Sequence, residues 1–324
     1  GGIRGGDATI LARAITLVES NAPRHLQQAQ ELLAELMPDT GGSVRVGITG
    51  VPGAGKSTFI EALGTWLCDQ GRKVAVLAVD PSSSVTRGSI LGDKTRMEQL
   101  ARHPNAFIRP SPSAGTLGGV TRKSRETILL CEAFGFDTIL VETVGVGQSE
   151  TTVRSMVDFF LLVLIAGAGD ELQGIKKGVI ELADMILVNK ADGANVQPAR
   201  MARAEYGRVL SFLQPATPGW KTIAQTCSAR EGTDIDKAWR RVEEFVERTK
   251  ASGFFDQRRA SQRIDWMRSM IEDSLRAAFF GDPQAKAALA EIEPGVASGN
   301  TPATAAVQEL MDAFWQRKRE NSHG

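Results

Sequence analysis

The chain has 324 residues, enough for one large domain or about two average ones. Hydrophobic residues make up 42% of it and charged residues 23%, a composition typical of globular proteins rather than of long disordered segments. Lys and Arg together number 38, as do Asp and Glu, so the formal net charge is zero. Because nucleic acids and anionic membranes attract a basic surplus, we expect neither as a partner.

The segment before residue 43 carries apolar residues at helical spacing in two runs separated by Pro23. Pro38 and the pair Gly41–Gly42 then interrupt the pattern. An apolar stripe needs a surface to pack on, so residues 1–42 are predicted to be an N-terminal helical hairpin docked on the next domain.

From Val44 the pattern changes to short apolar runs that alternate with helical stretches. Strands are predicted at Val44–Thr49, Val74–Val79, Thr138–Val141, Phe160–Ile165 and Met185–Val188, with a weaker one at Ile223–Cys227. Helices are predicted at Lys56–Gln70, Lys94–Arg102, Val120–Phe134, Ile175–Ala183 and Pro198–Leu210. Nearly continuous apolar strands are typical of parallel sheets covered on both faces. Residues 43–250 are therefore predicted to form a doubly wound, mostly parallel α/β domain.

After Thr249 the strand pattern stops, and residues 251–324 are predicted to form a C-terminal helical arm. One apolar stripe consists of Ile264, Met267, Ile271 and Leu275, and two further helices are predicted at Pro283–Ile292 and Thr304–Arg319. Three helices cannot bury this much apolar surface among themselves, so we expect the arm to form a homodimer interface. The alternative is that the arm packs on its own nucleotide domain.

Residues 50–57 have the sequence GVPGAGKS, which matches the phosphate-binding pattern GxxxxGK[ST] between a strand and a helix. In that setting backbone N–H groups and the helix N-terminus surround phosphates. Lys56 is expected to reach the β- and γ-phosphates, and Ser57 to bind Mg²⁺. The predicted phosphate-binding residues are Gly50, Val51, Pro52, Gly53, Ala54, Gly55, Lys56, Ser57 and Thr58. The alternative is a glycine-rich turn that happens to contain a lysine.

A second motif, Asn189-Lys190-Ala191-Asp192, follows the predicted strand Met185–Val188. The Asp192 carboxylate can accept hydrogen bonds from the ring N–H and exocyclic amine of guanine, which adenine does not offer. Ser228 and Ala229, after the weak strand, are expected to seat the guanine O6. Alone the tetrapeptide is weak and is equally compatible with a helix-capping turn, but after a phosphate loop it indicates GTP.

Three acidic residues are expected to complete a Mg²⁺ shell with Ser57, directly or through water, namely Asp80, Asp93 and Glu142. Glu142 ends a strand where phosphate-loop enzymes place the metal shell and the γ-phosphate sensor. It also counts, with Lys56 and Lys176, among the predicted catalytic residues. Lys176 follows a glycine-rich loop that we expect to respond to the nucleotide. Each of these predictions has an alternative without a function. Glu142 could be an ordinary surface glutamate, Asp93 a solvated acid in a loop, and the loop before Lys176 a simple connection from strand to helix.

Together these motifs resemble the MeaB/ArgK/MMAA-type GTPases, the metallochaperone-like GTPases that serve adenosylcobalamin-dependent methylmalonyl-CoA mutase. The resemblance spans essentially the whole chain and depends on five segments: GVPGAGKS at 50–57, VDPSS at 79–83, VETVGVGQSE at 141–150, GDELQGIKKG at 169–178 and NKAD at 189–192. It implies hydrolysis of GTP with Mg²⁺, and a chaperone that binds and protects the mutase and gates loading of its cobalamin cofactor. It also implies a homodimer built with the C-terminal arm.

Two other functions remain open. A nickel-delivery maturation GTPase would carry His-rich tracts or Cys/His pairs, whereas the three histidines and three cysteines here are scattered. An ATP-dependent kinase of a transport protein would not need the guanine motif. Scattered cysteines indicate a reducing compartment, and no signal peptide is visible, so we expect a cytoplasmic protein, or one of the mitochondrial matrix if the source is eukaryotic.

Overall fold

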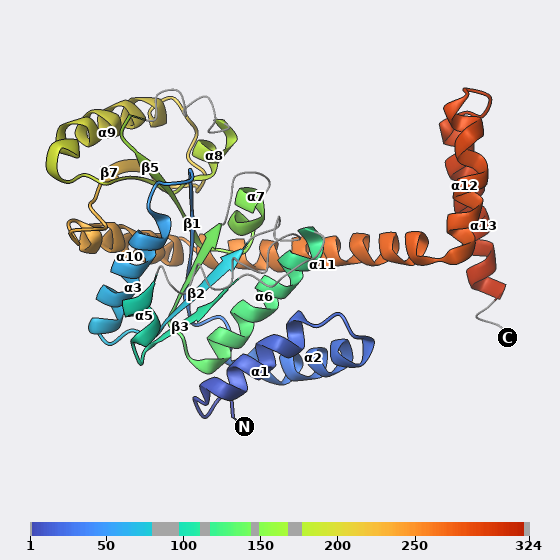
Figure 1. Cartoon of the computed structure of the whole chain (residues 1–324), viewed down its shortest axis with the longest axis horizontal. Helices are drawn as coiled ribbons and strands as arrows, with labels where there is room; N and C mark the ends of the chain where they lie inside the picture. Colours follow the sequence, from blue (N-terminus) through green and yellow to red (C-terminus); the bar gives the residue numbers. More distant parts are fainter. Residues whose placement is uncertain (1, 80–96, 111–116, 144–148, 168–176, 321–324) are drawn as a thin grey trace. The chain divides into compact units, whose positions relative to one another are not determined.

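The computed structural model describes residues 2–79, 97–110, 117–143, 149–167 and 177–320, which divide into two compact units, 1–262 and 263–324. Each unit is described by itself (Figure 1). Within the described ranges, no helix is long and apolar enough to cross a membrane.

The first unit is built on a seven-stranded sheet in the order β3-β2-β4-β1-β5-β6-β7, in which every pairing is parallel. The strands are β1 Val44–Gly50, β2 Val74–Val79, β3 Ala106–Arg109, β4 Thr138–Thr143, β5 Phe159–Ile165, β6 Met185–Asn189 and β7 Ile223–Thr226. The six predicted strands and the parallel α/β fold are confirmed. The edge strand β3 was not predicted, because it has only four residues, all half-buried, and lacks a long apolar run.

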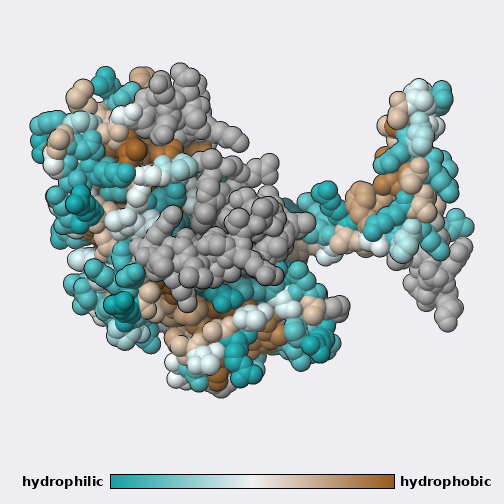
Figure 2. Space-filling model, viewed as in Figure 1, coloured by the Kyte–Doolittle hydropathy of each residue, from teal (hydrophilic) through white to brown (hydrophobic). Residues whose placement is uncertain are grey.

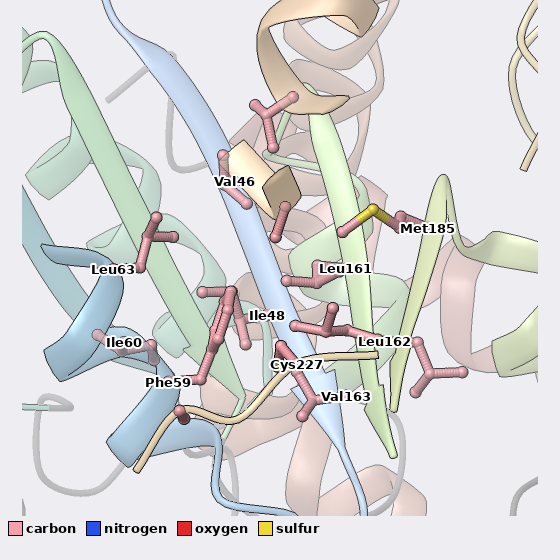
Figure 3. Close-up of a cluster of buried hydrophobic side chains, with 14 of the residues drawn as sticks. Val46, Ile48, Phe59, Ile60, Leu63, Leu161, Leu162, Val163, Met185 and Cys227 are labelled. Carbon is pink, nitrogen blue, oxygen red and sulfur yellow. The ribbon is translucent and has the colours of Figure 1, made fainter. Parts of the chain in front are cut away.

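Helices cover both faces of this sheet. They are α3 Lys56–Asp69, α5 Glu98–Arg102, α6 Leu117–Phe134, α7 Ser149–Arg154, α8 Lys177–Leu182, α9 Val196–Leu210 and α10 Ile235–Ala251. One apolar cluster joins α3, α9 and α10 to the sheet, and its centre, with Ile48, Phe59 and Leu161, is drawn in Figure 3. A second cluster joins α6 and α7 to the opposite face, where Ile139 and Val141 point. Alternate residues of the central strands therefore enter different cores, which explains their continuous hydrophobicity.

The N-terminal hairpin consists of α1 Ala8–Glu19 and α2 Pro23–Leu36, followed by a short 3₁₀ turn at Met37–Asp39. The Asp7 carboxylate caps α1 by accepting hydrogen bonds from the backbone N–H groups of Thr9 and Ile10. Leu11, Ile15 and Val18 are buried in the second cluster, and both helices contact α6 (Figure 1). The predicted hairpin is thus confirmed and belongs to the same compact unit as the sheet.

The C-terminal part consists of α11 Phe254–Gly281, α12 Pro283–Ala297 and α13 Ala303–Glu320. The two compact units divide within α11, after Gln262. Phe279 of α11 packs on Phe314 of α13, with ring centroids 5.2 Å apart. The stripe Ile264, Met267, Ile271 and Leu275 stays 48–51% exposed, and hydrophobic surface on this unit is visible in Figure 2. The helical arm is confirmed, whereas the boundary expected at residue 251 stays a prediction.

The exposed stripe generates a test of the expected homodimer. Replacing Ile271 by Glu places a charge in the middle of the stripe, so we expect the mass measured by light scattering to fall from that of a dimer to that of a monomer. Ser269→Glu, on an exposed position of the same helix outside the stripe, serves as the control and should leave the dimer intact. A dimer that survives Ile271→Glu would place the interface elsewhere.

Candidate nucleotide-binding site

The phosphate loop lies between β1 and α3 and depends on glycine at defined positions. Gly50, Gly53 and Gly55 have φ angles of 149°, 77° and 84°, which residues with a Cβ rarely adopt. A Cβ on Gly50 would lie 2.0 Å from the carbonyl oxygen of Val163, and one on Gly55 would lie 2.6 Å from Nδ2 of Asn189. The loop therefore lies in close contact with β5 and with the end of β6 as well as with its own strand.

Lys56 begins α3 and folds back over the loop. Its Nζ donates hydrogen bonds to the carbonyl oxygens of Gly50, at 2.9 Å, and Val51, at 3.3 Å. Burial lowers the pKa of Lys56, and the negative charges of Glu142 and Glu150 oppose that shift. The ammonium group is therefore held at the loop together with two carboxylates, where it can meet the charge of bound phosphates.

Ser57 and Glu142 meet directly although 85 residues separate them. The Ser57 hydroxyl donates to Oε1 of Glu142 at 3.0 Å. Glu142 is only 4% exposed and stands at the end of β4, which pairs with β1 so that Ile48 lies opposite Glu142. A hydroxyl beside a buried carboxylate is an oxygen donor set of the kind that Mg²⁺ prefers, so these two residues fit the expected metal.

The other residues expected in the metal shell, Asp80 and Asp93, lie outside the described residues, as does Lys176. Their places in the site stay predictions. Within the described part of the chain, His, Cys, Asp and Glu side chains nowhere gather in threes as a metal site.

Asn189 joins two halves of the site, a role that the sequence motif did not reveal. Its Nδ2 donates to the carbonyl oxygen of Ala54 in the phosphate loop, at 2.8 Å. Its Oδ1 accepts a hydrogen bond from the backbone N–H of Ala229, at 3.0 Å. The next residue, Lys190, has a φ of 60°, a left-handed conformation that is uncommon for a residue with a side chain. The amide thus links the phosphate loop to the predicted base-binding segment.

The predicted guanine-binding residues come together after β6 and β7. Oδ2 of Asp192 accepts a hydrogen bond from the Ser228 hydroxyl at 2.6 Å, and the same hydroxyl accepts one from the backbone N–H of Glu231 at 3.1 Å. Ser228 also pairs with Thr233 through backbone bonds. These bonds hold the Asp192 carboxylate against the segment that follows β7, and its contact with a guanine base stays a prediction.

Glu150 is a further residue of the site to which the sequence motifs assign no role. It lies in the first turn of α7, is 5% exposed, and its charge, like that of Glu142, opposes the lowering of the Lys56 pKa by burial. A carboxylate in VETVGVGQSE was visible in the sequence, but its burial depends on how α7 packs. Its position near Lys56 therefore emerges only from the tertiary structure.

Comparisons with known proteins agree with this geometry. Residues 11–284 match the family model described as methylmalonyl-CoA mutase-associated GTPase MeaB. A probable GTPase of Mycobacterium tuberculosis is 54% identical over 95% of this chain and 92% of its own length. The mitochondrial methylmalonic aciduria type A homolog of Mus musculus is 45% identical over 98% of this chain and 79% of its own length. The crystal structure of a LAO/AO transport system kinase has a TM-score of 0.79 at 40% identity, covering 97% of this chain and 95% of that one.

The bond between Asp192 and Ser228 generates a test of base recognition. Asp192→Asn keeps one side-chain oxygen that can accept the hydrogen bond from Ser228. It replaces the other oxygen, which is predicted to face the base, by an NH₂ group, and this donor would face the N–H donors of guanine. We expect GTP affinity to fall about a hundredfold and affinity for xanthosine triphosphate to rise. Asp236→Asn, at the start of α10, is the control. Equal dissociation constants for ATP and GTP in the unaltered protein would contradict guanine recognition altogether.

The bond between Ser57 and Glu142 generates a test of the metal site. Glu142→Gln keeps an oxygen that can accept from Ser57 but removes the negative charge. We expect the Mg²⁺ concentration for half-maximal GTP hydrolysis to rise about tenfold, because a neutral amide is a weaker Mg²⁺ ligand, direct or through water. The affinity for GDP measured without Mg²⁺ should stay within about twofold of the unaltered protein. An unchanged Mg²⁺ requirement would remove Glu142 from the metal shell.

Proposed function

We propose that this chain, which belongs to the family of methylmalonyl-CoA mutase-associated GTPases, is a GTPase chaperone of an adenosylcobalamin-dependent methylmalonyl-CoA mutase. The observation that carries the proposal is the family match over residues 11–284, together with 45% identity to a methylmalonic aciduria type A homolog. In this role the chain binds and protects the mutase and gates loading of its cofactor.

The described residues suit hydrolysis of GTP by positioning and charge stabilisation. The backbone of residues 50–57 holds the phosphates, and Lys56 offsets the negative charge of the β- and γ-phosphates. Mg²⁺, held by Ser57 and by Glu142 directly or through water, supplies further neutralisation of that charge when bound. Asp192 and Ser228 select the base, and Asn189 keeps the base-binding and phosphate-binding segments in register.

Intrinsic hydrolysis is proposed to be slow. In Ras-like enzymes a glutamine after the glycine of the strand-end motif orients the attacking water, whereas Val146 follows Gly145 here. A valine side chain cannot hydrogen bond to water. A rate of ~10⁻³ s⁻¹, the scale of unassisted GTPases, follows for the isolated protein.

The partner is proposed to act through the two glycine-rich loops, 82–93 and 167–177. Most of these residues, Lys176 included, lie outside the described ranges, so the support comes from their positions after strand ends on the nucleotide side of the sheet. Loops at such places can be ordered by phosphate and Mg²⁺ and released after hydrolysis. Mutase and chaperone would then meet in the bacterial cytoplasm, or in the mitochondrial matrix of a eukaryote.

A second candidate function, kinase of a transport protein, has one observation in its favour, the name of the similar crystal structure. The residues themselves support GTP, because adenine lacks the ring N1–H and the 2-amino group of guanine from which the Asp192 carboxylate would accept hydrogen bonds. We therefore place the mutase chaperone first.

Purified mutase tests the proposal. We expect it to raise the rate of GTP hydrolysis at least tenfold above the slow basal rate, since a partner that completes a GTPase site can add orders of magnitude. Lys176→Ala should lose most of this stimulation, whereas Lys221→Ala, an exposed lysine before β7, should keep it. Unchanged hydrolysis in the presence of mutase would refute coupling. Equal stimulation of Lys176→Ala would keep the coupling but remove Lys176 from it.

A further inference from the structure

The short helix α7 packs against β1, the strand that ends in the phosphate loop. Glu150, in its first turn, is buried, and its negative charge acts on Lys56. GTP carries one more phosphate than GDP, and Lys56 is the side chain expected to meet it. The added phosphate therefore brings negative charge toward a site that already holds the carboxylate of Glu150. This gives α7 an interaction that differs between the two nucleotides.

The body of α7 fits against β1 with no spare room. A Cβ on Gly47 would lie 2.9 Å from Cγ1 of Val153 and 2.9 Å from Cγ2 of Val157. Both valines are fully buried. Well-packed interiors do not deform continuously, so α7 and the turn that follows it are expected to shift as one body.

The C-terminal end of α7 is held by a side chain from the root of the arm helix. Nε2 of Gln262, on α11, donates to the carbonyl oxygen of Val157 at 2.9 Å. Arg125 of α6 completes this contact. Its Nη2 donates to the carbonyl oxygen of Ser155 at 2.8 Å, and its Nη1 donates to the carbonyl oxygen of Gln262 at 3.2 Å. One end of α7 thus carries Glu150, and the other is bonded to α11.

Buried charges fix the same end of α7 to α11 more firmly. Arg154 pairs at 2.8 Å with Asp184, which precedes β6, and Nη1 of Arg258 on α11 lies 3.9 Å from the same carboxylate oxygen. Arg259 of α11 pairs at 2.7 Å with Asp158, which lies between α7 and β5. Arg258 donates to the carbonyl oxygen of Asp158, and burial, with the nearby charge of Arg154, lowers its pKa to about 10. Breaking a buried ion pair is costly because it leaves an uncompensated charge. The first turns of α11 are therefore expected to follow the end of α7.

We propose that Gln262 is a positioning residue for GTP binding and hydrolysis, acting through α7, so that the nucleotide at the phosphate loop and the root of the C-terminal arm are energetically coupled. The proposal rests on nucleotide binding and is independent of any partner enzyme. Differential affinity is required for such coupling, and we attribute it to the added charge of the γ-phosphate at Lys56, on which the charge of Glu150 also acts. Coupling is reciprocal, so a change at the arm root must alter the preference between GDP and GTP.

A double-mutant cycle on the full-length chain tests the proposal. Gln262→Met keeps the length of the side chain and removes its N–H donors, and Glu150→Gln removes the charge at the other end of α7. Gln257→Met, at an exposed position of the same helix, is the matched control. The measurements are the dissociation constants for GDP and for a non-hydrolysable GTP analogue, and kcat and KM for GTP without mutase.

We expect Gln262→Met to change the ratio of the two dissociation constants, and kcat, by about threefold or more, while Gln257→Met leaves both unchanged. In the Glu150→Gln background, the effect of Gln262→Met on the ratio of dissociation constants should largely disappear. The reason is that Glu150→Gln removes the charge whose interaction differs between GDP and GTP. Arg125→Lys, which keeps the charge but cannot bond to Ser155 and Gln262 together, should reproduce the shift in the ratio.

Two outcomes would overturn the proposal. In the first, Gln262→Met and Arg125→Lys lower the melting temperature but leave the ratio and kcat as in the unaltered protein, which would make these contacts purely structural. In the second, the effects of Gln262→Met and Glu150→Gln on the ratio multiply independently, which would mean that α7 does not connect them. Neither result depends on mutase, so failure here is distinguishable from failure of the chaperone proposal.

Discussion

The side-chain amide of Asn189 connects three stretches of chain that the sequence keeps far apart. It donates to the phosphate loop at Ala54 and accepts from Ala229 after β7, while its own backbone ends β6. Because both bonds are buried, a rearrangement that broke either would leave a polar atom without compensation. Asn189 therefore links the predicted phosphate-binding loop to the predicted base-binding segment, and the pairing of β1, β5 and β6 keeps that residue in place.

The parts of the fold that the sequence predicted are those with a strong local signal. The central strands are buried on both faces, so their residues are almost all apolar and the strands can be recognised as apolar runs in the sequence. The edge strand β3 and the six-residue helix α7 were not predicted, because each is short and is stabilised by neighbours distant in sequence. The tertiary contacts of α7 with Gly47 and Gln262 leave no periodic pattern in the chain.

The candidate site divides in the same way. The phosphate loop and Asn189–Asp192 are motifs of consecutive residues, so the sequence alone was enough to predict a role for them. The hydrogen bond from Ser57 to Glu142 agrees with roles inferred separately for each residue. Glu150 could not be assigned, because an acidic residue in the first turn of a helix is ordinary until its burial is known. The sequence thus assigned roles to the residues of contiguous motifs, but not to residues such as Glu150 whose surroundings depend on tertiary packing.

Gly47 has a consequence for how this chain can vary. It lies on β1 three residues before the phosphate loop begins, and three side chains, those of Val153, Val157 and Phe160, occupy the space that a methyl group would need. Any other residue there would push α7 away from the strand that ends in Gly50. The packing of α7 against β1 therefore leaves no room for even one added methyl group at Gly47. Side chains elsewhere in the second cluster can repack around a substitution. A larger residue at Gly47 would instead move α7 relative to β1, the strand that leads into the phosphate loop.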